Sequence, residues 1–401
     1  MSFTNDLKVS FFLSFTSIKR GSRKTTVLTI ILMSIVVVNI AVIPSFISGV
    51  GKTFSQSSID YTIGNLFISP NGDKIYIDDA SSKLKKIEGV SGIVAASARY
   101  NTGATLVYKN ANLGVNVLGI NPDDEERVTN FHKKIIEGEF ISENDENEIV
   151  LGYSISGEEG KGELADTLGG VKVGEKIRAV YTNGMEREYR VKGIYRATSF
   201  ADYFAFISKK EAEYVLNVSN KASSIIIKTS EQGQEESYKR DIIGAGIGEK
   251  VKTWKEKMEN VTKEVTQSLT ILSIITVFVS LIIAAVVLFI VIYIHTVNKR
   301  KQMGILRAMG IKRGIIICSF VFESMFYTFA GIILGSFAIT LFFVYLTNHP
   351  IDFITGDLIP VFEINILVQG FLSLILVSVI AGFIPSWRIT SQNIVEEIFG
   401  K

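Results

Sequence analysis

The sequence predicts a membrane α-helical fold with four transmembrane helices and a large α+β extracytoplasmic domain inserted between helices 1 and 2. Three observations support this prediction: four long apolar segments, a charged segment between the first two of them, and an uneven distribution of Lys and Arg. Hydrophobic residues make up 47% of the chain and charged residues only 20%, which is a more apolar composition than most globular proteins have.

Four segments contain no Asp, Glu, Lys or Arg, and each is long enough to cross a membrane. They are residues 25–51, 265–298, 324–351 and 364–387. About 20 apolar residues in a helix cross a hydrocarbon core of about 30 Å. The first segment follows a basic region, as in a signal peptide, but it is too long for the apolar part of one and no small-residue cleavage pattern follows it. We therefore expect four spans, the first of them an uncleaved signal anchor.

The basic residues near the span ends predict the orientation, because Lys and Arg are enriched in cytoplasmic loops. They gather before the first span and between the second and third spans, whereas the link between the third and fourth spans carries only acidic residues. We therefore expect a multi-pass protein of the cell membrane, with both termini and residues 299–313 in the cytoplasm and residues 52–264 outside it.

Ahead of the first span, Leu7, Phe11, Phe15 and Ile18 recur at helical spacing. This periodicity predicts an amphipathic helix that lies on the inner leaflet, with its apolar face toward the lipid and its basic residues toward the headgroups. The alternative is a plain helical extension of the first span.

The segment 52–264 carries many charges of both signs and is large enough to bury a core of its own. Short alternating runs predict strands, two of them joined as a hairpin by Thr182-Asn183-Gly184. The expected strands are 65–69, 93–98, 104–108, 115–120, 148–151, 176–181, 188–195 and 223–229, and the expected helices are 80–87, 209–216 and 234–243. We expect loops over 137–170, and a helical stalk within 220–264 that continues into the second span.

No motif predicts catalysis. Gly51-Lys52-Thr53 resembles the end of a phosphate-binding loop, but Phe46 stands where that loop needs a glycine. The three histidines are far apart, and the single cysteine, Cys318, lies inside the third span, so neither a metal site nor an internal disulfide is expected. We predict that the chain is not an enzyme and has no cofactor, no metal and no nucleic-acid partner.

The most informative segment is 299–310, which reads Lys-Arg-Lys-Gln-Met-Gly-Ile-Leu-Arg-Ala-Met-Gly. Its apolar residues and its two glycines predict a short amphipathic helix, and such a helix is suited to a groove on a partner. The residues expected to contact this partner are Arg300, Gly304, Ile305, Leu306, Arg307 and Gly310. The two arginines would supply planar donors for carboxylates. The alternative is that they only set the orientation.

This segment is similar to the signature of the FtsX-like permease family, which includes the macrolide exporter and the lipoprotein-releasing permeases. Phe322-Glu323-Ser324, followed by Gly331 and Gly335, resembles the start of that family's third span, and residues 385–398 resemble its C-terminal ending. Three residues depart from the family pattern: Met303, Ser386 and Asn393.

The layout resembles the lipoprotein-releasing members along the whole chain. It consists of a first span within residues 1–51, an outer domain at 52–264 similar to the MacB-type periplasmic core, and three spans within 265–401 that include a coupling helix at 299–313.

The resemblance implies one half of a type VII ABC transporter. Two permeases, forming a homodimer or a heterodimer, would bind two cytoplasmic ATPase subunits, which alone would bind ATP. Movement would pass through residues 304–310 and the second span to the outer domain, exporting or extracting a lipoprotein, peptide, lipid or drug-like substrate. Membrane lipid and an extracytoplasmic adaptor or substrate protein would be further partners. The alternative is a non-transporting mechanotransmission permease that regulates a cell-wall hydrolase or acts as a sensor.

Four residues inside the spans are candidates for packing or coupling. Glu323 lies ten residues beyond Arg313, roughly 15 Å along the helix, where an acid is costly and usually faces a partner or water. A shallow interfacial position is the alternative. Gly331 and Gly335 form a small-residue face for close helix packing, either at a dimer seam or within one subunit. Pro385 belongs to the family-like C-terminal segment.

Overall fold

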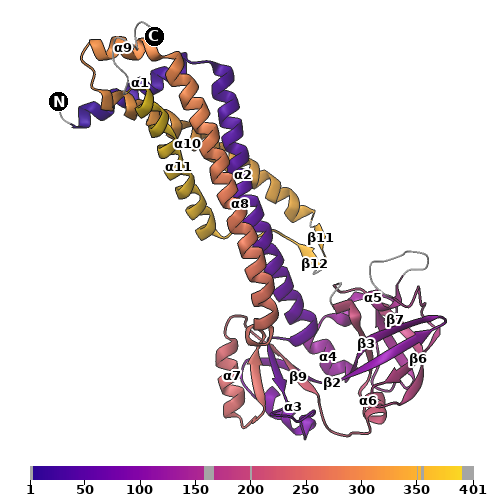
Figure 1. Cartoon of the computed structure of the whole chain (residues 1–401). Coiled ribbons are helices and arrows are strands. Elements are labelled where there is room, and N and C mark those ends of the chain that lie inside the picture. The colour runs from indigo at the N-terminus through magenta and orange to yellow at the C-terminus, as the bar shows by residue number, and fades with distance from the viewer. Residues whose placement is uncertain (1–2, 158–166, 199–200, 350, 354–355, 391–401) are drawn as a thin grey trace. The chain divides into compact units, whose positions relative to one another are not determined.

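The computed structural model describes the chain apart from residues 1–2, 158–166, 199–200, 350, 354–355 and 391–401. It divides into two compact units, which we call the membrane unit and the outer unit (Figure 1). The membrane unit holds residues 1–51, 265–351 and 358–401, and the outer unit holds residues 52–264 and 352–357. The family-like ending beyond residue 390 and part of the predicted loop tract at 158–166 lie outside the described residues.

Four described helices are long and apolar enough to cross a membrane. They contain three of the predicted segments in full and residues 324–348 of the predicted segment 324–351. They are α2 (Arg23–Ser57), α8 (Trp254–Asn298), α10 (Arg313–Asn348) and α11 (Ile364–Thr390). Two shorter helices, α1 (Phe3–Arg20) and α9 (Arg300–Ala308), lie at the same end of the membrane unit (Figure 1). Between α10 and α11 the chain forms the strands β11 (Ile351–Phe353) and β12 (Gly356–Leu358).

Helix α1 is an element separate from α2, because it ends at Arg20 and α2 begins only at Arg23. Its polar face is the buried one. Ser10 and Ser14 are buried, and the Ser10 Oγ donates a hydrogen bond to the Ile315 carbonyl of α10 at 3.0 Å. On the opposite face Phe11, Phe12 and Phe15 are exposed. This pattern suits a lipid surrounding, where hydroxyl groups need partners and apolar side chains do not.

The outer unit is built on a ten-stranded sheet with the order β10-β1-β9-β2-β3-β8-β5-β7-β4, in which β6 pairs with both β2 and β7. The strands are β1 (Leu66–Ser69), β2 (Ile93–Tyr108), β3 (Ala111–Ile120), β4 (Ile135–Gly138), β5 (Glu148–Gly152), β6 (Lys176–Tyr181), β7 (Glu186–Tyr195), β8 (Phe204–Ser208), β9 (Ser224–Thr229) and β10 (Lys250–Thr253). Because β6 connects β7 back to β2, the strands β2, β3, β8, β5, β7 and β6 form a closed barrel.

Between residues 58 and 253, the described part of the outer unit also contains five α-helices and three short helical turns. They are α3 (Ala80–Glu88), α4 (Pro122–Val128), α5 (Tyr153–Ser156), α6 (Lys209–Leu216) and α7 (Glu235–Gly244), with the π-helix η1 (Ser58–Ile63), η2 (Phe131–Lys134) and η3 (Ala201–Tyr203). One apolar core fills the barrel, around Leu106, Ile149 and Val191. Another joins β1 and β9 to α3 and α7, around Leu66 and Ile225. The unit is therefore an α/β domain with two lobes.

Most of the expected strands and helices are present. Strands β4 and β8 and helix α4 were not predicted, and three of the expectations differ from the structure. The two strands expected at 93–98 and 104–108 are one continuous strand, β2. The predicted loop tract also contains α5 and the end of β4. The expected stalk becomes helical only at Trp254, because β10 precedes it. In β10 the lysines point outward while Val251 and Thr253 are buried, as in an edge strand with one solvated face.

Candidate functional site

The candidate site begins at the elbow between α8 and α10. A single residue, Lys299, separates the end of α8 from the start of α9. The last turn of α9 closes at Gly310, whose amide donates to the Arg307 carbonyl at 2.9 Å. Gly310 has φ 92°, a left-handed conformation that glycine adopts without strain at a helix end. The structure therefore shortens the expected helix at 299–313 to nine residues followed by a tight turn.

The two faces of α9 differ. Met303 and Gly304 are buried against the membrane unit, and Leu306 packs at the edge of the same core. On the other face Ile305 is 54% exposed and Met309 is 67% exposed. Two large apolar side chains on a nine-residue helix with several charges form a small surface suited to a protein partner.

The arginines of this segment contact the end of α11. The Arg307 Nη1 donates to the Thr390 carbonyl at 3.4 Å, and the Arg313 Nη2 donates to the Trp387 carbonyl at 3.0 Å. The last carbonyls of a helix lack partners within the helix and carry partial negative charge, so they favour cations. Arg307 thus connects α9 to α11, and Arg300, the other predicted arginine, is half-buried.

A buried polar cluster lies beside this elbow, and we call it the glutamate cluster. Glu323 of α10 is 1% exposed. Its Oε1 lies 2.5 Å from the His295 Nδ1 of α8 and accepts a hydrogen bond from the Tyr327 hydroxyl at 3.1 Å. Its Oε2 accepts from the Ser17 Oγ of α1 at 2.8 Å, and the Lys299 Nζ donates to the same serine hydroxyl.

The glutamate cluster joins three helices at the point where α8 gives way to α9. A buried carboxylate is costly unless polar partners surround it, and here α1, α8 and α10 supply them. Any displacement of the end of α8 therefore disturbs these contacts. Sequence reasoning found Glu323 but missed His295 and Ser17, which lie 28 and 306 positions away. The available signal was that His295 is a titratable side chain within an otherwise charge-free span.

The two predicted glycines pack against α2 of the same chain. A Cβ added at Gly331 would lie 2.6 Å from the Met33 Cβ, and one at Gly335 would lie 2.7 Å from the Val37 Cγ1. Only glycine permits helices to approach this closely. Pro385 is buried within α11.

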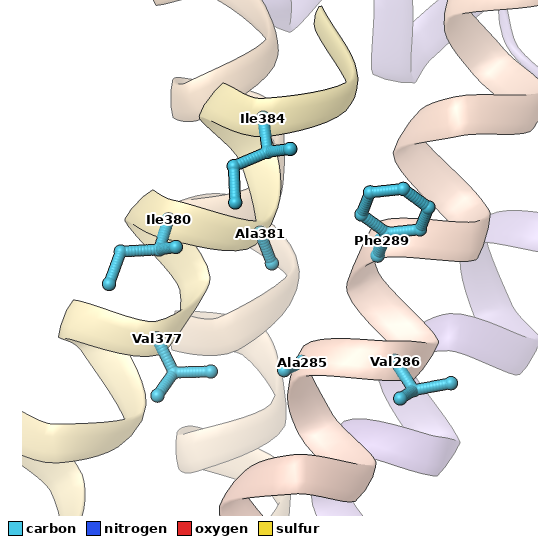
Figure 2. A pocket seen from close by; sticks show the side chains of 7 residues that line it. All are labelled: Ala285, Val286, Phe289, Val377, Ile380, Ala381 and Ile384. Carbon is cyan, nitrogen blue, oxygen red and sulfur yellow. The ribbon is translucent and has the colours of Figure 1, made fainter.

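Helix α8 is the least covered of the four spans. In its most apolar 18-residue stretch 17% of the residues are buried, compared with 28–33% in the other three spans. A groove of about 330 Å³ lies between α8 and α11. Figure 2 shows Phe289 facing Ala381 and Ile384 across this groove. All seven lining residues are apolar. This groove therefore offers no group for catalysis.

In the outer unit, the two segments that lead from and to the spans enter the sheet side by side. Strand β1 follows η1, and β10 leads directly into α8. The two strands pair antiparallel with Leu66 opposite Thr253, and the Trp254 amide donates to the Asn65 carbonyl at 3.0 Å. Both connections are therefore fixed to one edge of the sheet.

A buried ion pair holds the end of η1. Arg99 of β2 is 4% exposed and Glu125 of α4 is 0% exposed. The Arg99 Nε donates to the Glu125 Oε2 at 3.1 Å. Its Nη1 and Nη2 donate to the carbonyls of Thr62 and Tyr61 at 2.5 Å and 3.1 Å. We call this group the arginine clamp, because one guanidinium fixes η1 to both β2 and α4.

Within the part of the chain that the structure describes, no group of three or more His, Cys, Asp or Glu residues is arranged to hold a metal ion. The features described above are contacts between helices and strands rather than a reaction centre.

Two family models match the chain. Residues 26–245 match the MacB-like periplasmic core domain, and residues 274–394 match the FtsX-like permease C-terminal region. The first match alone covers more than half of the chain. The chain belongs to the MacB and FtsX type of ABC transporter permeases. The predicted family is thus confirmed, and the permease is a multi-pass membrane protein with an extracytoplasmic domain.

Individual relatives are distant. The permease is 24% identical over 295 residues to a Staphylococcus haemolyticus (strain JCSC1435) protein named "Putative hemin transport system permease protein HrtB", covering 72% of the permease and 75% of that relative. The extracellular domain of the noncanonic ABC-type transporter YknZ from Gram-positive bacteria is 14% identical, with a TM-score of 0.35, covering 47% of the permease and 97% of that domain. The periplasmic region of MacB from Actinobacillus actinomycetemcomitans is also 14% identical, with a TM-score of 0.35, covering 49% of the permease and 91% of that region.

Proposed function

We propose that the permease couples ATP hydrolysis by a separate cytoplasmic ATPase subunit to movement of its outer unit. In this proposal two permease chains, identical or different, form a dimer, and ATP binds only to the partner subunits. Both termini and α9 face the cytoplasm, and residues 52–264 face the outside. The movement exports a lipoprotein, peptide, lipid or drug-like substrate, or extracts it from the outer side of the membrane.

The observation that carries the proposal is the shape of α9. Its inner face is anchored through Met303 and Arg307, while Ile305 and Met309 remain exposed beside them. A partner that binds the exposed pair therefore acts on a helix that is attached to the rest of the membrane unit. An isolated surface loop would absorb the same force by moving alone.

Two helices, α8 and α2, connect the membrane unit to the outer unit along the chain, and α8 adjoins α9. Helix α8 runs without a break for 45 residues and its N-terminal end follows β10, so a shift or rotation of its far end is carried along the helix. Helix α2 continues into η1, which the arginine clamp holds against the sheet. The glutamate cluster connects the end of α8 to α1 and α10.

The name of the Staphylococcus relative supplies hemin as a first compound to test. A flat, largely apolar molecule of this kind fits the proposed class of drug-like substrates. Transport of hemin is a property to be measured for this permease, with a peptide and a lipoprotein as parallel substrates.

The test of coupling is an Ile305→Asp variant, assayed for binding to the ATPase that co-purifies with the wild-type permease. Burying an isoleucine side chain in an interface contributes about 1.5–3 kcal/mol to binding. We therefore expect Ile305→Asp to weaken the complex with the ATPase roughly 10- to 100-fold. The matched control is Ile136→Asp, because Ile136 is also half-exposed but lies on β4 of the outer unit. The coupling proposal fails if Ile305→Asp binds the ATPase and stimulates its activity as the wild type does.

A further inference from the structure

A second pocket, distinct from the groove of Figure 2, lies at the elbow. It encloses about 330 Å³ and is lined by α1, Lys299, α9 and the first turns of α10. Its lining is divided by polarity. Met303, Ile316 and Phe320 are apolar, whereas Arg20, Lys299 and Gln302 are polar or charged. This composition suits a ligand with one polar end and one apolar end.

The charge of the pocket is one-sided. Its lining includes two cations, Arg20 and Lys299, and no carboxylate. The Arg20 side chain is exposed, and within the described residues Lys299 donates to the carbonyl and the hydroxyl of Ser17. Glu323 accepts a hydrogen bond from the same Ser17 hydroxyl and is also bonded to His295 and Tyr327. Among the described residues that line the pocket, no carboxylate balances Arg20, whereas Lys299 is linked to Glu323 through Ser17.

The positions of Arg20 and Lys299 in the sequence indicate how deep in the membrane the pocket lies. Lys299 comes directly after the span that ends at Asn298, and Arg20 comes three residues before the span that begins at Arg23. Both cations thus lie where the spans leave the hydrocarbon core, at the level of the lipid phosphates. Basic pockets between helices at this level bind anionic headgroups.

We propose that this pocket binds an anionic phospholipid, with its phosphate between Arg20 and Lys299 and the start of an acyl chain against Met303, Ile316 and Phe320. The bound lipid lies between α1 and α9, beside the glutamate cluster. Membrane composition then influences how firmly α9 is held, independently of which substrate the outer unit handles.

The test uses the purified full-length permease in detergent, with phosphatidylglycerol and phosphatidylcholine that carry the same acyl chains. Lipid retention is measured by native mass spectrometry and thermal stability by the melting temperature. We expect selective retention of phosphatidylglycerol. A cation near the membrane surface contributes a factor of about five to such binding, so Arg20→Gln and Lys299→Gln each weaken retention about fivefold.

Two control variants separate lipid binding from structure. Lys19→Gln removes a charge from the exposed side chain next to Arg20 that does not line the pocket, and it should retain the lipid. Ser17→Ala removes the partner of Lys299 but keeps its charge, so retention should persist. If Ser17→Ala loses the lipid as Lys299→Gln does, the effect of Lys299 is structural and the proposal fails.

The remaining outcomes also decide the question. Equal retention of the two lipids, or equal effects of Arg20→Gln and Lys19→Gln, would overturn the proposal. Inorganic phosphate, added to the permease in phosphatidylcholine, should neither stabilise it nor displace phosphatidylglycerol. If phosphate does either, the pocket is a site for a free anion and not for a lipid.

Discussion

The arginine clamp permits a quantitative prediction for Arg99→Met. This variant leaves Glu125, which is 0% exposed, without its cationic partner, and it leaves the carbonyls of Tyr61 and Thr62 without the Arg99 donors. Breaking a buried ion pair by removing one partner costs about 3–5 kcal/mol. In a domain of about 200 residues, each kcal/mol lowers the melting temperature by about 2–4 °C. We therefore expect the outer unit to melt roughly 6–20 °C lower.

Tryptophan fluorescence measures this effect in the intact permease. The chain has two tryptophans, one in each unit, so a Trp387→Phe background leaves Trp254 as the reporter of the outer unit. Its Nε1 donates to the Glu235 Oε1 at 3.3 Å, within that unit. The contact of Trp387 with Arg313 uses the backbone carbonyl and is retained in the background variant.

Two variants test the reasoning. Arg178→Met removes an exposed ion pair with Glu186, of the kind that contributes at most about 1 kcal/mol. Combining Arg99→Met with Glu125→Leu removes both buried charges, so it should recover part of the lost stability, although the two carbonyls remain without their donors. If Arg99→Met melts no earlier than Arg178→Met, or if the double variant is less stable than Arg99→Met, the clamp does not stabilise η1 in this way.

Three other changes test separate parts of the structure. Burial raises the pKa of Asp202 to about 6. The folded form thus keeps a proton that the unfolded form releases above about pH 4, and stability falls by about 3 kcal/mol as pH rises from about 4 to about 6; Asp202→Asn removes this fall in urea titrations at each pH. Gly331→Ala places a Cβ 2.6 Å from an α2 side chain and costs about 1–3 kcal/mol, seen as earlier aggregation on heating in detergent. Glu323→Leu removes the carboxylate that Ser17, His295 and Tyr327 contact, and it lowers the free energy of unfolding by about 1–3 kcal/mol. Because α1 is then held less firmly, we expect a protease to cleave the chain faster just after Arg20, where α1 ends.

Each of these has its own control. If the stability of the wild type and of Asp202→Asn depends on pH in the same way, the Asp202 carboxyl is not responsible for the fall in stability. Gly314→Ala, where an added Cβ meets no atom within 4 Å, should melt as the wild type does, and an equal effect of both alanines would contradict the packing argument. Glu323→Gln keeps an acceptor oxygen, so it should be milder than Glu323→Leu; equal proteolysis of the two would show that the hydrogen bonds are unimportant.

The spans could be predicted because their signal is local. A long run without charges is visible in the sequence whatever the rest of the chain does, and Glu323 stood out for the same reason. Its partners did not, because His295 and Ser17 come from two other helices. The glycines on α10 likewise predicted close packing, but their partner α2 is determined only by the tertiary fold.

In the outer unit, the predictions for β2 and β10 were wrong because their pairing partners are far away in the sequence. Arg99 interrupts the apolar alternation of β2, so the sequence suggested two strands with a gap between them. The structure keeps one strand because Glu125 compensates the buried charge from a different element. Strand β10 was assigned to a helical stalk because Lys250 and Lys252 give it a charged face, and only its pairing with β1 makes it a strand.

The pairing of β1 with β10 also bears on how such chains evolve. Opposed residues in an antiparallel pair lie about 5 Å apart, so Leu66 and Thr253 bring the beginning and the end of the sheet to nearly one point. A domain whose ends meet can be inserted into a host protein, or exchanged for another, without altering the host. The first and last strands of the outer sheet in this permease therefore have the geometry expected of an inserted domain.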